Sequence, residues 1–314
     1  MVTVSRLCQF PQRSRLVLAA STAAAVALGM LAAGAGDAAA ATKKKKAAQP
    51  QPAQEPVAPQ KQPPLGENAY SWLLTINGTV LVSPVFPGAK TYGFIAFPSL
   101  SLRRTDSADK WQAPDDGISI ALWGDSQWAL GITGRYQPGR YYSQDRAGLY
   151  GVTDAKWAVE PGIFGEYWAV PETIRLRAEV RYGINGYNGF VGTLAADYVK
   201  RVGRFTLSVG PRVQISGSEY MDTYFGVTQQ DAAFNGKLTA YAPDPGIKSV
   251  GVAAAATYKW NDQWSTTVRG GYDRLVGSAA DSPIVKQLGS PNQFSVGATA
   301  SYTFDIGRFG LLNR

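Results

Sequence analysis

Apolar and polar residues alternate along much of the chain from residue 70 onward. In the stretch IRLRAEVRYG (174–183), every second side chain from Ile174 to Tyr182 is apolar and every intervening one is charged. A period of two places the two sets on opposite faces of a β-strand. A strand with one wet face in a soluble sandwich shows the same pattern, so this stretch alone leaves open which solvent each face meets.

Eleven segments show this alternation, and no 3.6-residue period persists in the folded part. They are 70–82, 92–103, 117–123, 127–136, 157–168, 174–183, 189–200, 204–215, 247–259, 264–275 and 293–304. Because single-chain bacterial barrels have even strand numbers, we predict about 12 strands, with about 10 as the alternative. Either one strand is missed between 137 and 156, or one strand is divided within 117–136.

Two features favour a transmembrane barrel over a sandwich. Several segments reach 10 to 13 residues, which is enough to cross a bilayer at a tilt, whereas strands of globular proteins are about half that length. Aromatic side chains lie near the ends of the apolar faces, where membrane-interface girdles belong. The predicted girdle consists of Trp72, Trp128, Trp157, Tyr167, Tyr182, Tyr198, Tyr258, Trp260, Trp264 and Phe304.

The connections between the segments alternate in length. Short turns at 201–204 and 261–263 alternate with long loops at 216–246 and 277–292. Short periplasmic turns and long external loops are typical of outer-membrane barrels. The pattern predicts an all-β fold, a transmembrane antiparallel up-and-down β-barrel over 70–304. We expect it to be closed, because backbone groups in hydrocarbon must be paired within the protein.

The two ends of the chain carry other signals. Residues 1–41 combine basic residues, an Ala-rich apolar run and small residues, which predicts a secretory signal peptide cleaved near Ala41. A retained membrane anchor is the alternative, because the apolar run is about 20 residues long. Residues 42–69, rich in Lys, Pro and Gln, are expected to be a periplasmic linker, either a solubilising spacer or a basic arm touching anionic polymer. Residues 305–314 are a predicted C-terminal tail.

Composition excludes several kinds of chemistry. Most of the formal net charge of +8 comes from the Arg residues of the signal and the Lys residues of the linker, so the barrel is nearly neutral and we expect no nucleic-acid partner. The chain has no His, and its single Cys lies in the signal, so neither a Ser-His hydrolase site nor imidazole metal ligation is available. Glu160 and Glu166 are roughly 20 Å apart along one strand, too far for a glycosidase pair. We expect no enzyme activity, cofactor or metal.

With the apolar faces turned to lipid, the opposite faces define a lumen that contains charges of both signs. The predicted lumen cluster consists of Arg135, Glu160, Glu166, Arg175, Arg177, Glu179, Arg181, Asp197, Arg212, Arg269 and Asp273. These charges form either a salt-bridged, hydrated plug or, because Arg is in excess, a lining that selects small anions. Strand number alone does not decide between a filled and an open barrel.

Three aromatic residues stand out in the long polar loop that contains YMDTYFGV. Tyr220, Tyr224 and Phe225 either fold the loop over the barrel mouth as an apolar plug or form a patch that binds a partner.

Several longer motifs follow one another through the C-terminal half. They are RLRAEVRYGINGYNGFVGTLAADYV (175–199), YMDTYFGVTQQDA (220–232), GIKSVGVAAAATYKWNDQWS (246–265), YDRLVGSAADSPIV (272–285) and NQFSVGATASYTF (292–304). In this order they resemble the MipA/OmpV family of outer-membrane proteins, the MltA-interacting proteins. The resemblance implies a bacterial outer-membrane barrel. For the best-known members it also implies a scaffold that brings a lytic transglycosylase and a murein synthase together, while other relatives are described as adhesins.

The leading hypothesis is therefore a non-enzymatic barrel held in outer-membrane lipid, with a scaffold role for murein-remodelling enzymes. The alternatives are a small-solute channel that favours anions and a surface adhesin. The sequence does not reveal the oligomeric state.

Overall fold

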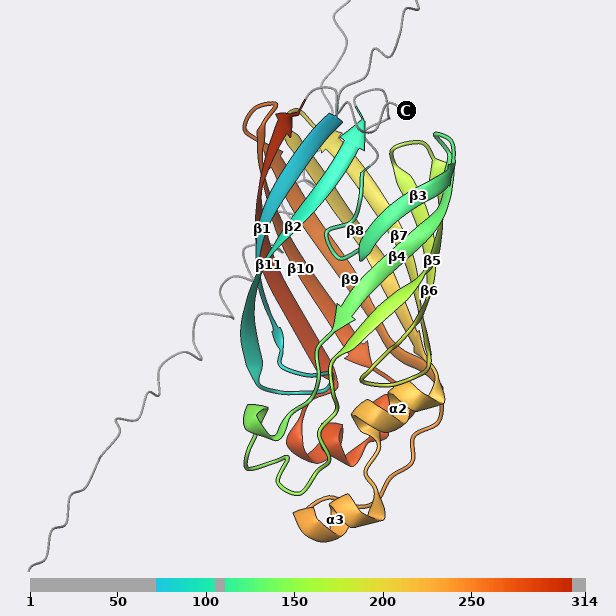
Figure 1. Ribbon diagram of the computed structural model, residues 1–314, viewed down its shortest axis with the longest axis vertical. Helices are drawn as coiled ribbons and strands as arrows, with labels where there is room; N and C mark the ends of the chain where they lie inside the picture. The colour runs from blue at the N-terminus through green and yellow to red at the C-terminus, as the bar shows by residue number, and fades with distance from the viewer. Residues whose placement is uncertain (1–71, 105–110, 307–314) are drawn as a thin grey trace, which may run out of the picture. The chain divides into compact units, whose positions relative to one another are not determined.

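The strands form one antiparallel sheet that curls around a central lumen (Figure 1). The computed structural model describes residues 72–104 and 111–306. The predicted signal peptide, the linker and most of the predicted tail lie outside the described residues.

The sheet contains every segment in which the sequence alternates. Its strands are β1 (Trp72–Pro84), β2 (Tyr92–Arg104), β3 (Ile118–Gly124), β4 (Trp128–Gln137), β5 (Ala158–Val170), β6 (Ile174–Tyr182), β7 (Phe190–Val202), β8 (Phe205–Ser216), β9 (Gly246–Lys259), β10 (Trp264–Leu275) and β11 (Asn292–Asp305). Each predicted segment agrees with a strand to within two residues at either end. The all-β antiparallel fold is confirmed.

The described residues contain eleven strands, not the 12 or 10 that were expected. Residues 138–157, which cover most of the segment where a further strand was expected, form a loop with one 3-10 turn, η1 (Tyr142–Gln144). Pro138 has no N–H to donate to a ladder, and Gly151 has a φ of 72°, which extended strands do not use. This loop therefore separates β4 from β5 without adding a strand.

The odd number of strands produces a seam between β2 and β3. The sheet order is β2-β1-β11-β10-β9-β8-β7-β6-β5-β4-β3, so among the described residues no ladder joins its two edges. Since β2 is antiparallel to β1 and the antiparallel pairings continue around the sheet to β3, β2 and β3 run in the same direction (Figure 1). The expected closure by hydrogen bonds all the way round is thus not present in the described part of the chain.

The alternation in the sequence becomes a difference between the two faces of the sheet. In β6 the exposed and buried positions alternate strictly, with Arg175, Arg177, Glu179 and Arg181 buried on the inner face. Large apolar side chains cover the outer face, including Phe94, Leu100 and Ile163, which are each more than 60% exposed. An apolar outer face around a polar interior is the arrangement that a barrel in a bilayer requires.

The two ends of the sheet differ in their connections. One end, the turn end, has short turns at 125–127, 171–173, 203–204 and 260–263. The other end, the cap end, has the long loops and, besides η1, four further short helical segments (Figure 1). These are α2 (Ser218–Phe225), α3 (Gln229–Asn235), α4 (Gly277–Asp281) and the π-helical turn η2 (Ile284–Leu288).

None of the helices in the described residues is long and apolar enough to cross a membrane.

Candidate functional site

The inner face of β5 to β8 forms a dense charged wall in the lumen. Arg175, Arg177, Glu179 and Arg181 of β6 are each at most 4% exposed. Their neighbours across the ladder carry complementary charges, because Arg177 pairs in register with Glu166 of β5 and Arg175 with Asp197 of β7. Burial of this many charges is tolerated only when each is paired and hydrogen-bonded.

Arg175 lies at the centre of this wall and is fully buried. Its guanidinium donates to Asp197 Oδ2 at 2.7 Å and to Asp116 Oδ2 at 2.7 Å, and Glu166 Oε2 is 3.4 Å away. The Trp111 ring lies over its Cζ, with the ring centroid 4.7 Å away. Three carboxylates and an indole therefore surround a single guanidinium.

A second group of ion pairs continues toward the cap. Arg177 Nε donates to Glu179 Oε1 at 2.8 Å, and Arg181 donates to the other oxygen of the same carboxylate. Arg181 Nε also donates to Glu160 Oε2 at 2.9 Å. Every charged residue of β6 thus takes part in one continuous network with Glu160 and Glu166.

The segment from Trp111 to Gly117 enters the lumen between β2 and β3, which sequence reasoning did not anticipate. Asp115 accepts two hydrogen bonds from Arg212, at 2.7 and 3.1 Å, and Asp116 accepts from Arg175. The carbonyl oxygens of Pro114 and Asp115 accept from two further guanidinium groups, those of Arg269 and Arg135. A Pro-Asp-Asp turn has no periodicity, so the pattern of the sequence did not reveal this lumen segment.

With the lumen segment included, the described charges below the cap balance. The cations are Arg135, Arg175, Arg177, Arg181, Arg212, Lys248 and Arg269, and the anions are Asp115, Asp116, Glu160, Glu166, Glu179, Asp197 and Asp273. All eleven residues of the predicted lumen cluster lie here. Arg212 donates to Asp197 at 2.7 Å, and Asp273 accepts from Gln214 at 3.3 Å. The Arg excess seen in the sequence is thus offset by Asp115 and Asp116.

The inner face of β1 and β11 is different and forms a threonine wall. Thr75 and Thr303 share a hydrogen bond of 2.7 Å, and Thr79 and Thr299 share one of 2.9 Å. Both are pairs of directly opposite residues in the β1–β11 ladder. This side of the lumen is lined by small uncharged groups.

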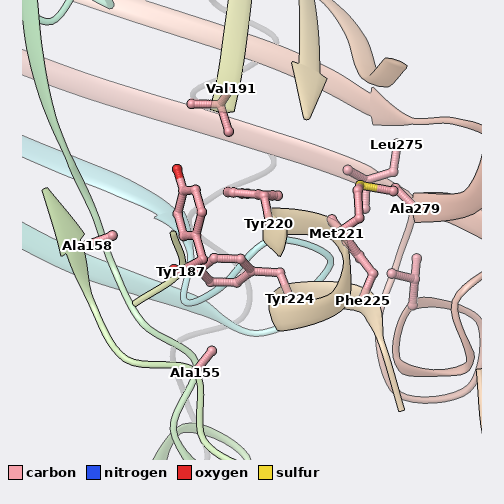
Figure 2. Packing of buried hydrophobic residues seen from close by; sticks show 11 residues of the cluster. Ala155, Ala158, Tyr187, Val191, Tyr220, Met221, Tyr224, Phe225, Leu275 and Ala279 are labelled. Carbon is pink, nitrogen blue, oxygen red and sulfur yellow. The ribbon is translucent and has the colours of Figure 1, made fainter. Parts of the chain in front are cut away.

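An aromatic cap packs at the end of the barrel with the long loops. Figure 2 shows Tyr187, Tyr220 and Tyr224 gathered with Phe225 and Met221 of α2. Tyr220, Tyr224 and Phe225 are at most 1% exposed. The rings of Tyr187 and Tyr220 meet edge to face at 4.9 Å. Because these side chains are buried, they do not offer a patch to a partner in this conformation.

The cap is joined to the charged wall through Tyr187. Its hydroxyl donates to Glu160 Oε1 at 2.5 Å, while the other oxygen of Glu160 accepts from Arg181. Burial, and then the neighbouring Glu160 carboxylate, raise the pKa of the Tyr187 phenol far above its usual range. Tyr187 therefore stays a neutral donor at every physiological pH.

Buried polar contacts tie the cap to the loop that follows β4. Arg140 is 3% exposed and donates to the Tyr224 carbonyl at 2.6 Å and to the Thr153 carbonyl at 3.1 Å. Burial lowers the pKa of the Arg140 guanidinium to about 10, which leaves it charged at neutral pH. Asp231 of α3 accepts from the Thr153 hydroxyl at 2.8 Å and, in a capping box, its backbone N–H donates to Thr228.

The predicted girdle residues lie near the two ends of the outer face. Trp157 and Tyr182 lie at the cap end, and the other eight lie at the turn end, namely Trp72, Trp128, Tyr167, Tyr198, Tyr258, Trp260, Trp264 and Phe304. The cap end gains further exposed rings that the prediction omitted, among them Tyr136, which stacks on Trp157 with centroids 6.2 Å apart, and Phe190, which meets Tyr182 edge to face. The described outer face thus has aromatic residues at both ends.

In the described residues, no group of three or more acidic, Cys or His side chains is placed to hold a metal ion. The carboxylates of the charged wall are already paired with guanidinium groups of the same network.

Comparison with known proteins finds both sequence relatives and solved structures that align with this chain. The chain is 26% identical over 175 residues to the MltA-interacting protein of Escherichia coli K12, which covers 54% of this chain and 68% of that protein, and the Shigella flexneri protein of the same name matches equally. Among solved structures, the NanC porin aligns with a TM-score of 0.36 at 9% identity, over 73% of this chain and 98% of the porin. A likeness at that TM-score bears on neither the fold nor the function of this chain.

The family match is much more extensive. The profile of the family described as MltA-interacting protein MipA matches residues 76–304, which run from within β1 almost to the end of β11. The same residues form the sheet, the charged wall and the cap. The chain therefore belongs to the MipA family of MltA-interacting proteins.

Proposed function

We propose that the protein is a non-enzymatic outer-membrane barrel whose role is to present a binding surface rather than to conduct solutes. The contacts that cross the lumen carry this proposal. The Trp111–Gly117 segment and the charged wall occupy its middle, and the aromatic cap covers one end. The apolar outer face and the aromatic residues at both ends support an outer-membrane location.

The turn end is the surface that we assign to the partner. In outer-membrane barrels the short turns face the periplasm, where murein-remodelling enzymes act. This end displays exposed charges in and beside its turns, including Glu172, Arg201 and Arg204. The name of the relatives, together with the family membership, supports a lytic transglycosylase as one partner, and the family resemblance adds a murein synthase.

Co-purification from crosslinked envelopes tests the scaffold role. We expect a lytic transglycosylase to be enriched with the tagged protein, and we expect a variant with Glu172, Arg201 and Arg204 each replaced by Ser to lose that enrichment while still folding. The control is a cap-end variant, Lys286→Ser, because Lys286 is also an exposed charged residue but lies at the opposite end. Equal enrichment with an unrelated barrel would refute the proposal.

Planar-bilayer recording tests the filled lumen against the channel hypothesis. We expect no discrete conductance from the wild-type protein and discrete steps from the double variant Asp115→Asn, Asp116→Asn. The substitutions remove the charges that hold the lumen segment to Arg175 and Arg212. Steady wild-type conductance that the substitutions leave unchanged would favour a channel.

A further inference from the structure

A small polar cavity lies between the charged wall and the cap. Its volume is about 20 Å³, which is space for one or two water-sized particles. The polar side chains in its wall include Arg135, Arg181, Lys248, Glu160, Gln214 and Ser216, and Tyr220 of the cap also lines it. It is lined by residues from β4 to β9 and from α2.

The wall of this cavity contains more cations than anions, although two of the cations are already paired with carboxylates. Three of the residues are cations and one, Glu160, is an anion. Both oxygens of Glu160 are already used, since Oε2 accepts from Arg181 and Oε1 accepts from Tyr187. Arg181 is paired with Glu160 and Glu179, and Arg135 lies 3.7 Å from Glu179, so the positive charge that remains for a ligand is that of Lys248.

Lys248 of β9 is the cation with the fewest partners. Its ammonium donates to the Tyr220 hydroxyl at 3.2 Å and lies 4.6 Å from the centroid of the same ring. No carboxylate of the described residues forms an ion pair with it within 4.0 Å. Since an ammonium has three donors, Lys248 retains hydrogen-bonding capacity that its protein neighbours do not fill.

Ser216 at the end of β8 provides a second, independent indication. It is 2% exposed, and its Oγ is among the buried side-chain atoms of the described residues that have no hydrogen-bond partner. Buried hydroxyl groups are nearly always paired with protein or with a bound particle. A donor without a partner beside cations is the arrangement that a small anion completes.

We propose that this cavity binds a single monatomic anion of the chloride class, held by Lys248, Ser216 and the guanidinium groups of Arg135 and Arg181. The small volume favours a monatomic ion over polyatomic anions such as sulfate. The site is bordered on the cap side by Tyr220. The inference is independent of the scaffold role, which depends on the opposite end of the barrel.

Chloride nuclear magnetic resonance linewidths of the purified protein in detergent micelles test the site. We expect saturable broadening that bromide removes and sulfate at equal ionic strength does not. Lys248→Met should abolish the broadening. Ser216→Ala, which removes one hydrogen bond worth about 1 kcal/mol, should weaken chloride binding about fivefold. The matched control is Lys200→Met, which removes an exposed lysine of β7 and should leave binding unchanged.

Three results would overturn the proposal. The first is the absence of saturable broadening in the wild type, which means that the cavity holds water only. The second is displacement by sulfate as effective as displacement by bromide, which places the ion at an open surface. The third is chloride affinity in Ser216→Ala equal to that of the wild type. This last result decides the matter even if Lys248→Met does not fold, because the serine change is nearly isosteric.

Discussion

The charged wall and the threonine wall face the same lumen but stabilise it in different ways. On β5 to β8, side chains reach across strands and out to the lumen segment, so that Arg212 meets Asp115, 97 residues away in sequence. On β1 and β11, each hydroxyl bonds to the residue directly opposite in the ladder. The charged wall holds separate parts of the chain together, whereas the threonine wall only reinforces a pairing that the backbone already makes.

Replacing Arg175 tests the charged wall most severely. Arg175→Met leaves Asp116, Asp197 and Glu166 without their central cation, and breaking a buried ion pair on one side costs about 3–5 kcal/mol. We expect that loss in the free energy of unfolding, measured by urea titration of the barrel in lipid vesicles. Arg201→Ala breaks an exposed pair with Glu172 and should cost less than about 1 kcal/mol. Equal losses of unfolding free energy in Arg175→Met and Arg201→Ala would show that ion pairs in the charged wall stabilise the protein no more than an exposed pair does.

Removing one hydroxyl tests the link between the charged wall and the cap. Tyr187→Phe deletes the hydrogen bond to Glu160, and a bond to a charged group contributes about 1.5–3 kcal/mol. We expect a loss of that size, together with faster proteolysis within residues 217–245, which limited digestion and mass spectrometry will locate. Unchanged digestion would mean that the cap is held without Glu160.

The pH dependence of stability tests whether Asp231 of α3 acts through its charge. Burial would raise the pKa of Asp231, but hydrogen bonds from Thr153 and Thr228 outweigh it and hold the pKa below its usual range. The Asp231 carboxylate therefore contributes fully to the free energy of unfolding above the pKa of about 3.9 that it has in the unfolded chain. This contribution is lost as the pH falls through the lower pKa of the folded protein. We expect Asp231→Asn to cost about 1 kcal/mol at pH 7 and progressively less below about pH 4. A difference that stays constant down to pH 2 would contradict this.

The threonine wall should show the smallest effect. Thr79→Ala removes the hydrogen bond to Thr299, and a cross-strand pair of this kind contributes about 0.2–1 kcal/mol. Neither partner titrates, so the same loss is expected at pH 7 and pH 4 in unfolding titrations. A loss comparable to that of Arg175→Met would remove the distinction between the walls.

Local periodicity was sufficient to predict the strands. Each alternating segment, including 174–183, became a strand because side chains at a spacing of two residues must lie on one face. The same alternation placed Arg175 and Glu179 on the buried face. A period of two therefore indicates which face of its own strand a side chain lies on.

Periodicity did not predict the partners of those side chains. Asp115 and Asp116 lie in a short turn without a repeating pattern, and their importance appears only when the fold brings them beside Arg175 and Arg212. Arg140 and Lys248 acquire their roles in the same way, through contacts with α2. Contacts between segments that are distant in sequence follow from how the sheet curls, and one sequence carries no local signal for that.

The order of the strands has a consequence for assembly. The β1–β2 hairpin is hydrogen-bonded to the rest of the sheet only through β11 in the described residues, so the first strands to be synthesised wait for the last one before they join the ladder. Pairing residues more than 200 positions apart makes this step slow, because a long loop must close first. Until β11 pairs with β1, the β1–β2 hairpin forms no ladder with the rest of the sheet. A chain that ends before Asn292 would therefore keep the ladders from β3 to β10 but leave the β1–β2 hairpin unpaired. Pairing of β11 with both β1 and β10 is thus the step that joins all the described strands into one sheet.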